Sequence, residues 1–286
     1  MPKKPKGRRY APAPNIEHVT THPVTGMIVR GPMALNGVGD DRDPFAHQIL
    51  PRQKRKHESI RGSEARFLRT PGASLYTGIA PVHALSFASK AFESSIEGDF
   101  WTVSDFVWPD MTAARSQPGL LSWESPKHCG EWYPDSWVRR PGHLDRLIEC
   151  KPVSEARPDK DKYPEEAQAA ALRFAAMEEA TAALGMRFTL YTELEIRSEP
   201  RFHNAKAMRR ALSSHITDPM LAEAAAILKT LPEHMTVLEF SKHLGSLAGS
   251  ALNIACLLDR YGGLHLDRSS YFLPRSRFQN LVSRFV

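Results

Sequence analysis

The chain has 286 residues, of which 42% are hydrophobic and 24% are charged, enough apolar surface to bury one large core or two modest ones. Its three cysteines, Cys129, Cys150 and Cys256, are too few and too scattered for a disulfide framework or a Cys-x-x-Cys zinc site. No apolar run approaches the ~18–20 residues of a membrane span, and no apolar stretch follows the basic first residues as it would in a secretory signal. These features predict a soluble, cytoplasmic protein with no membrane partner.

Positive charge is concentrated near the N-terminus. Residues 1–70 hold 14 Lys and Arg against 6 Asp and Glu, although the whole chain carries a net charge of only +6. Residues 1–62 also hold eight of the 22 prolines and show no sustained periodicity, so we expect an extended arm with at most one short strand at 26–30. Such an arm suits a polyanionic partner, DNA or RNA first, and a solubilising tail is the alternative. The candidate DNA-binding residues are Lys3, Lys4, Lys6, Arg8, Arg9, Arg52, Lys54, Arg55 and Lys56.

The middle of the chain predicts alternating helices and strands. The expected elements are a helix at 86–101, strands at 132–139 and 144–150 joined by a turn at 140–143, a helix from Pro164 to just before Gly185, and a strand that begins at Arg187. The last quarter predicts three small helices, at 218–231, 237–244 and 250–261, followed by two short strands within 264–273. The Thr236–Glu239 capping box marks the start of the second of these helices. This order is typical of a winged-helix domain, with a boundary near residue 212.

Two acidic residues and a lysine of the predicted hairpin are the candidates for chemistry. If the hairpin is centred on Gly142, Asp135 lies opposite Glu149, with Cβ atoms roughly 4.5–5.5 Å apart. Two carboxylates at that distance repel each other unless a cation lies between them, and Mg²⁺ prefers such oxygen ligands. Lys151 lies on the same strand face as Glu149, whereas Cys150 points to the other face. The alternative is a solvated strand face, on which a lone Glu-x-Lys pair is common.

A fourth candidate, Glu97, lies in the predicted helix upstream. Its acidic neighbours Glu93 and Asp99 are competitors for the same role. Glu97 fits better because the apolar stripe of Phe92, Ile96 and Phe100 would anchor the helix beside it.

These motifs resemble the PD-(D/E)xK core of restriction-endonuclease-like enzymes and, more narrowly, the TnsA endonucleases of heteromeric transposons. The segments that carry the resemblance are Ser94-Ser-Ile-Glu97-x-x-Phe100, Tyr133-Pro-Asp135-x-x-Val138, Ile148-Glu149-Cys-Lys151-Pro152 and Tyr191-Thr-Glu193-Leu-Glu195-Ile-Arg197. The resemblance covers roughly residues 85–286, with Ser136 where the family usually has an aromatic residue. It implies an α/β fold with a central mixed sheet flanked by helices and a C-terminal winged helix. The implied domains are an arm at 1–62, an endonuclease domain at 63–212 and a winged-helix-like domain at 213–286.

The resemblance also implies a function. Glu97, Asp135 and Glu149, helped by the Cys150 carbonyl, would bind one or two Mg²⁺ ions, for which Mn²⁺ can substitute, and Lys151 would assist the attacking water. The protein would then be a metal-dependent endodeoxyribonuclease that hydrolyses phosphodiesters at the 5′ ends of a transposon. Its implied partners are transposon-end DNA, a transposase subunit and an AAA+ ATPase regulator that docks on the C-terminal domain, in a prokaryotic, nucleoid-associated setting. Two alternatives stay open: a non-catalytic DNA-binding or assembly module on a nuclease fold, and a standalone restriction or repair nuclease.

Overall fold

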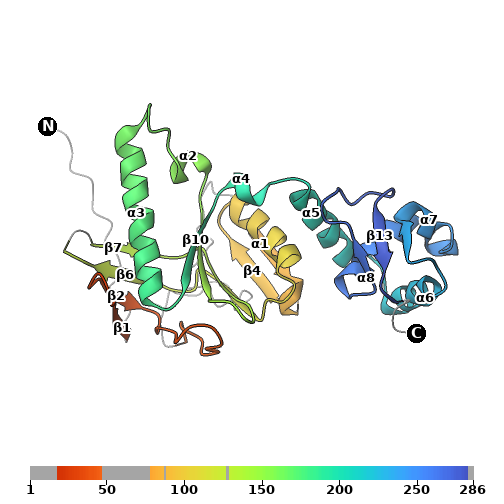
Figure 1. Ribbon diagram of the computed structural model, residues 1–286, viewed down its shortest axis with the longest axis horizontal. Coiled ribbons are helices and arrows are strands. Elements are labelled where there is room, and N and C mark those ends of the chain that lie inside the picture. The colour runs from red at the N-terminus through yellow and green to blue at the C-terminus, as the bar shows by residue number, and fades with distance from the viewer. Residues whose placement is uncertain (1–17, 47–77, 87, 127–128, 283–286) are drawn as a thin grey trace, which may run out of the picture. The chain divides into compact units, whose positions relative to one another are not determined.

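The chain forms a mixed α/β structure, as predicted. The computed structural model describes residues 18–46, 78–86, 88–126 and 129–282 (Figure 1). The chain divides into two compact units, which are described separately. Unit 1 takes in the residues up to Ile79, Lys90–Ser94 and Thr112–Tyr191, whereas unit 2 takes in Ala80–Ser89, Ser95–Met111 and Thr192–Val286.

Unit 1 is built on two four-stranded sheets. The first has the order β1-β2-β6-β7 and is antiparallel, and the second has the order β10-β9-β8-β5, in which β10 and β9 run parallel and the other pairs antiparallel. The strands are β1 (His18–Thr21), β2 (Ile28–Gly31), β5 (Ala113–Ser116), β6 (Leu121–Glu124), β7 (Cys129–Trp132), β8 (Ser136–Arg139), β9 (Arg146–Cys150) and β10 (Arg187–Tyr191). Helices α2 (Val153–Ala156) and α3 (Pro164–Ala183) connect β9 to β10. The second sheet therefore combines one parallel pair with two antiparallel pairs.

Helix α3 has the bounds that its sequence signals predicted. Pro164 occupies the first turn, where its missing N–H costs no hydrogen bond, and the helix stops before Gly185. Gly185 has a φ of +69°, and a Cβ there would collide with the carbonyl oxygen of Leu35. The buried side chains of α3, including Met177 and Ala180, join a core that also takes in residues of both sheets. The helix thus covers one face of the mixed sheet (Figure 1).

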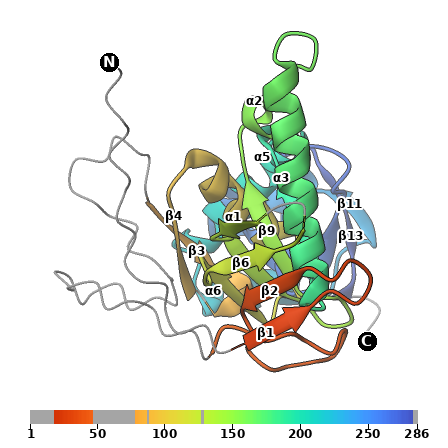
Figure 2. The ribbon, with the colours of Figure 1, turned by 90° about the vertical axis from the view of Figure 1, so that its left-hand side faces the viewer.

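Residues 18–46 belong to unit 1, although the sequence predicted an extended arm over 1–62. The strand expected at 26–30 is present as β2, and it pairs with β1 and β6. Met27, Val29 and Phe45 are buried in the core of unit 1, and the Leu35 N–H donates to the carbonyl of Leu184 at 2.9 Å. Figure 2 shows β1 and β2 beside the C-terminal end of α3. The apolar residues of this segment are too few to show a period in sequence, but they are held by a sheet whose other strands come from much later in the chain.

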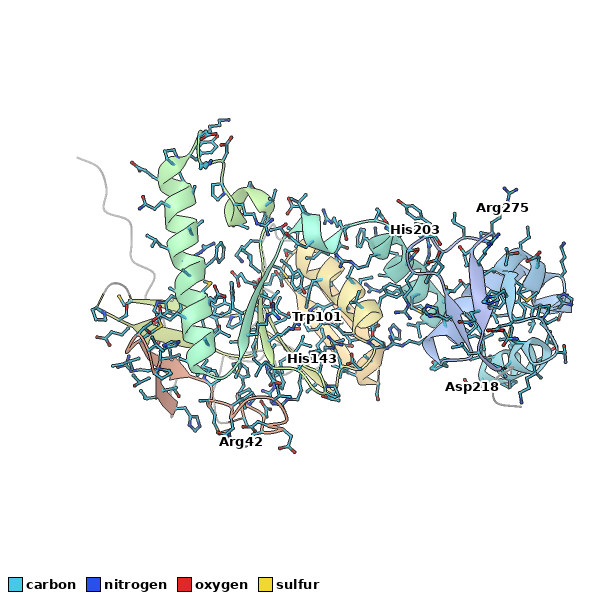
Figure 3. All side chains as sticks on the ribbon, viewed as in Figure 1. Arg42, Trp101, His143, His203, Asp218 and Arg275 are labelled. Carbon is cyan, nitrogen blue, oxygen red and sulfur yellow. The ribbon has the colours of Figure 1, made fainter. Side chains whose placement is uncertain are left out.

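Unit 2 contains most of the helices and a three-stranded antiparallel sheet of order β11-β13-β12. Its elements are η1 (His83–Leu85), α1 (Ser95–Val107), α4 (Glu193–Ile196), α5 (Arg201–Leu212), α6 (Asp218–Leu228), β11 (His234–Thr236), α7 (Val237–Ser241), η2 (Gly245–Ser250), α8 (Ala251–Arg260), β12 (Leu264–Leu266) and β13 (Arg277–Asn280). The strands β3 (Gly78–Val82) and β4 (Ala88–Phe92) form a further two-stranded sheet, whose residues are divided between unit 1 and unit 2. Figure 3 marks Asp218, which opens α6, and Arg275, which precedes β13.

The three helices predicted in the last quarter are present as α6, α7 and α8. The capping box that begins α7 is formed, with the Thr236 side chain accepting from the Glu239 N–H at 3.1 Å. The terminal hairpin differs from its prediction. Both strands were expected within residues 264–273, but the second strand begins at Arg277. Pro274 interrupts the chain between the two strands and cannot donate to a ladder.

The bounds of unit 2 differ from the predicted domain boundary at 212/213. Helix α5 buries Phe202, Ala205 and Met208, and it packs against both α1 and α8. Seven of the ten residues of α8 are buried. A fragment of residues 213–286 would therefore lack α5, the helix that packs against α8.

A buried carboxylate also ties α1 to the rest of unit 2. Asp105 in α1 contacts His83 Nδ1 at 2.7 Å, and its carbonyl accepts from Arg260 Nη1 at 2.7 Å. Burial raises the pKa of the Asp105 carboxyl, but hydrogen bonds from His83 and Ala84 outweigh burial, so its pKa lies below the ordinary value. These contacts explain why α1 groups with residues more than a hundred positions later.

Two further predictions need correction. The helix expected at 86–101 begins only at Ser95, after β4. The strand expected from Arg187 ends at Tyr191, because Thr192 caps α4 and Glu195 completes a capping box with it. The same Thr-x-x-Glu signal that located α7 was present here, but the apolar alternation of the preceding strand masked it.

Candidate active and metal site

The candidate site lies at one end of the β8–β9 hairpin, whose register confirms the prediction. Ser136 pairs with Ile148 and Val138 with Arg146, so the next pair along the ladder places Asp135 opposite Glu149. The strand predicted over 132–139 is interrupted at Tyr133–Asp135, because Pro134 cannot donate to a ladder. Asp135 therefore directly precedes β8 and lies at the end of the sheet.

The two carboxylates are buried and share one ammonium group. Asp135 is 5% exposed and Glu149 is 4% exposed. Lys151 Nζ lies 2.9 Å from Glu149 Oε1 and 3.8 Å from Asp135 Oδ2. The alternative of a solvated strand face is thus wrong. Buried carboxylates in proteins are usually paired, and both of these lie against the Lys151 ammonium.

Neighbouring donors fix the direction of both acids. The Cys150 N–H donates to Asp135 Oδ2 at 2.7 Å, so β9 holds the side chain that precedes β8. The indole N–H of Trp132 donates to Glu149 Oε2 at 2.7 Å. Trp132 also lies in the core of unit 1, with its ring centroid 5.5 Å from that of Phe188. A buried indole N–H needs an acceptor, and this was the only sequence signal that could have linked Trp132 to the site.

The predicted alternation along β9 agrees with the contacts. Glu149 and Lys151 form an ion pair and so lie on one side of the strand. Cys150, which stands between them in the sequence, is buried and forms no disulfide. The Lys151 N–H donates to the carbonyl of Tyr191 at 3.0 Å, so β10 holds the end of β9 that carries the site. Any role for the Cys150 carbonyl remains a prediction.

Glu97 and its two competitors have different surroundings. Glu97 is buried in the first turn of α1 and belongs to unit 2, whereas Asp135, Glu149 and Lys151 belong to unit 1. Its membership of the site remains a prediction. Asp99 accepts from Arg197 Nε at 2.7 Å, so it is engaged in an ion pair within unit 2. Glu93 lies in unit 1 and accepts from Gln117 Nε2 at 3.3 Å.

The donor set of unit 1 fits Mg²⁺ in kind. Asp135 and Glu149 supply hard carboxylate oxygens, and a cation, the Lys151 ammonium, already lies against both. Among the described residues no group of three or more His, Cys, Asp or Glu side chains could hold a metal ion. A two-carboxylate set is nevertheless usual for Mg²⁺, which keeps several waters and takes a substrate phosphate as a further ligand.

The nine predicted DNA-binding residues, which run from Lys3 to Arg9 and from Arg52 to Lys56, lie outside the described residues. No family model matches the chain, and no curated protein matches it either. Within the described part of the chain, no helix combines the length and the apolar character that a membrane crossing requires.

Proposed function

We propose that the chain is a Mg²⁺-dependent endodeoxyribonuclease of the PD-(D/E)xK type. The observation that carries this proposal is the buried Asp135–Glu149 pair with Lys151 between its oxygens at the end of a mixed sheet. The two carboxylates supply hard oxygen ligands side by side at the end of the sheet, which is the donor set that Mg²⁺ prefers.

Each residue of the cluster has a separate task in this proposal. Asp135 and Glu149 would hold the metal ion, with Glu97 as a further ligand by resemblance. Bound Mg²⁺ would supply an activated water and neutralise charge on the phosphate. Lys151 is the most exposed of the three groups in the cluster, and its ammonium would stabilise charge on the scissile phosphate.

The decisive experiment is a cleavage assay on labelled transposon-end DNA in Mg²⁺ or Mn²⁺. The chain is tested alone, with a transposase subunit, and with both the transposase and an AAA+ ATPase regulator, and Asp135→Asn serves as the inactive control. We expect 5′-end cleavage that requires partners and is absent in the variant. Cleavage by the chain alone would favour a standalone nuclease, and DNA binding without cleavage in every mixture would favour an assembly module.

We further propose that the C-terminal elements dock a partner, as the resemblance implies. The order α6, β11, α7, α8, β12, β13 supports a winged helix, but α8 is buried within unit 2 and offers little surface. Leu238 and Leu273 are about half exposed, and the Leu238 N–H donates to the carbonyl of Pro274 at 2.6 Å, so the two leucines lie close together. Leu238→Glu should weaken binding of the ATPase regulator in a pull-down without lowering the melting temperature. Unchanged binding would exclude this surface.

The basic N-terminal residues are proposed to add DNA affinity that does not depend on sequence. A deletion of residues 1–60 would remove β1, β2 and part of the core of unit 1, so the informative variant lacks residues 1–17 alone. This deletion removes five basic residues, Lys3, Lys4, Lys6, Arg8 and Arg9. At about 0.9 per phosphate contact, the slope of log K against log salt should flatten by up to about 4.5. An unchanged slope, measured by fluorescence anisotropy, would show that these residues do not contact phosphates.

A further inference from the structure

Gln117 combines a buried side chain with a backbone conformation that suits glycine. It has a φ of +43° and is 1% exposed, and it directly precedes Pro118. A non-glycine residue in the left-handed region is strained, and a following proline restricts its backbone further. Residues held in such conformations cluster at functional sites.

The position of Gln117 in unit 1 places it beside Asp135. Ser116, the last residue of β5, pairs with Ser136, the first residue of β8. Gln117 therefore leaves β5 at the same end of the sheet at which Asp135 enters β8. The Gln117 N–H donates to the carbonyl of Asp135 at 2.9 Å, which continues the ladder by one bond.

The side chain of Gln117 makes a second connection. Its Nε2 donates to Glu93 Oε2 at 3.3 Å, and Glu93 follows β4 within unit 1. Gln117 thus joins Glu93 to the main chain of Asp135. The carboxylate of Asp135 is held from the other strand, where the Cys150 N–H donates to Oδ2. The aspartate is therefore fixed at its main chain from β5 and at its side chain from β9.

We propose that Gln117 is a positioning residue of the metal site. Its hydrogen bond to Glu93 holds the 116–117 peptide in the strained conformation, and that peptide holds Asp135 in the orientation that binds the metal. The inference rests on the proposed metal-dependent function. A glycine at position 117 would adopt this conformation at lower cost but would leave the peptide without its anchor on Glu93.

The chain offers a variant that separates strain from positioning. Gln117→Gly relieves the backbone strain and removes the amide, so the melting temperature of the metal-free protein should stay equal or rise. The affinity for Mn²⁺, measured by calorimetry without DNA, should nevertheless fall by ~10–100-fold, as when outer partners of metal ligands are removed. Ser86→Gly is the matched control, because Ser86 also has a positive φ, +55°, but is exposed and lies in unit 2. Ser86→Gly should leave Mn²⁺ affinity unchanged.

Variants of Glu93 test whether it anchors Gln117 or binds the metal itself. Glu93→Gln keeps an amide oxygen that can accept from Gln117, so Mn²⁺ affinity should stay close to that of the wild type. Glu93→Ala removes the acceptor and should weaken affinity as much as Gln117→Gly does. The double variant Glu93→Ala/Gln117→Gly should be no weaker than either single variant, because the two side chains act through one connection.

The outcomes separate this inference from the nuclease proposal. Wild-type Mn²⁺ affinity in Gln117→Gly would overturn the positioning role. A loss of Mn²⁺ affinity in Glu93→Gln as large as the loss in Asp135→Asn would also overturn it, because Glu93 would then be a metal ligand. The expected pattern of affinities in a protein that never cleaves DNA would support the inference while the nuclease proposal fails. A wild-type protein that binds no Mn²⁺ would overturn both.

Discussion

The two ends of the β8–β9 hairpin each carry buried acid, and their surroundings differ. Near the turn, Asp145 accepts from Trp137 Nε1 at 3.0 Å and from Arg139 Nη2 at 2.7 Å, with Arg139 Nε at 3.1 Å from its other oxygen. At the open end, Asp135 and Glu149 share Lys151 as their common cation.

The comparison shows how a structural acid differs from a candidate functional one. The guanidinium fork of Arg139 matches the carboxylate of Asp145 with two donors, so the charges balance one to one. At the open end, two buried carboxylates lie against one partly exposed ammonium. Two hard carboxylate ligands side by side suit the binding of a divalent cation, whereas the Asp145 carboxylate is already engaged by the Arg139 fork.

The largest effect is expected from Asp135→Asn at the open end of the hairpin. Asp135→Asn keeps an oxygen for the Cys150 N–H but removes one of two like charges. DNA cleavage should be abolished, and the melting temperature of the metal-free protein should stay equal or rise. Mn²⁺ at a hundredfold excess over its dissociation constant should stabilise the wild type by about 2.7 kcal/mol and should not stabilise this variant. Equal stabilisation by Mn²⁺ in both proteins, measured by thermal melting, would contradict the metal assignment.

Lys151→Ala should preserve metal binding but reduce cleavage. The substitution removes a cation beside both carboxylates without removing a ligand. Cleavage in the full assembly should fall by ~10²–10³-fold, the usual cost of losing one preorganised electrostatic group. Cys150→Ala is the control, because it deletes a buried thiol and leaves the main chain that holds Asp135. Cleavage by Lys151→Ala at the wild-type rate would exclude this motif as the catalytic one.

Asp145→Asn should have the opposite effects to Asp135→Asn: it should lower the free energy of unfolding and leave the metal affinity unchanged. Removing one partner of a buried ion pair costs about 3–5 kcal/mol. We expect about 3 kcal/mol, the lower limit, because Arg139 also donates to the carbonyls of Asp41 and Arg42. Urea unfolding measures the loss, and calorimetry on the folded protein should give wild-type Mn²⁺ affinity. A stability equal to that of the wild type would remove the contrast between the two ends.

The smallest effect concerns the indole that orients Glu149. Trp132→Phe keeps an aromatic ring beside Phe188 but removes the N–H donor. Mn²⁺ affinity should fall by ~10–100-fold, as it does when an outer hydrogen bond to a ligand is lost. Trp123→Phe is the matched control, since Trp123 lies in the same core and its Nε1 is buried with no hydrogen-bond partner. If the two variants bind Mn²⁺ alike, Trp132 acts through packing alone.

The sequence determined the elements whose signals are local. Pro164 and Gly185 bracket α3, the Thr236 capping box begins α7, and the turn at Gly142 sets the register that pairs Asp135 with Glu149. Each of these signals acts within a few residues, through the fixed φ of proline, the left-handed φ of glycine or the two-residue period of a strand. The three central candidates of the site could therefore be named before any tertiary contact was known.

The tertiary structure decided the features that depend on distant segments. Residues 18–46 pack in unit 1 because β2 pairs with β6, nearly a hundred positions away. Trp132 and Gln117 reach the site because β7 and β5 end beside it, and α5 joins unit 2 because α1 and α8 cover its buried face. Such contacts leave no period or cap in the sequence. They arise only when strands and helices from separate parts of the chain bury their apolar faces together, and that burial also gives the two carboxylates their low-dielectric surroundings.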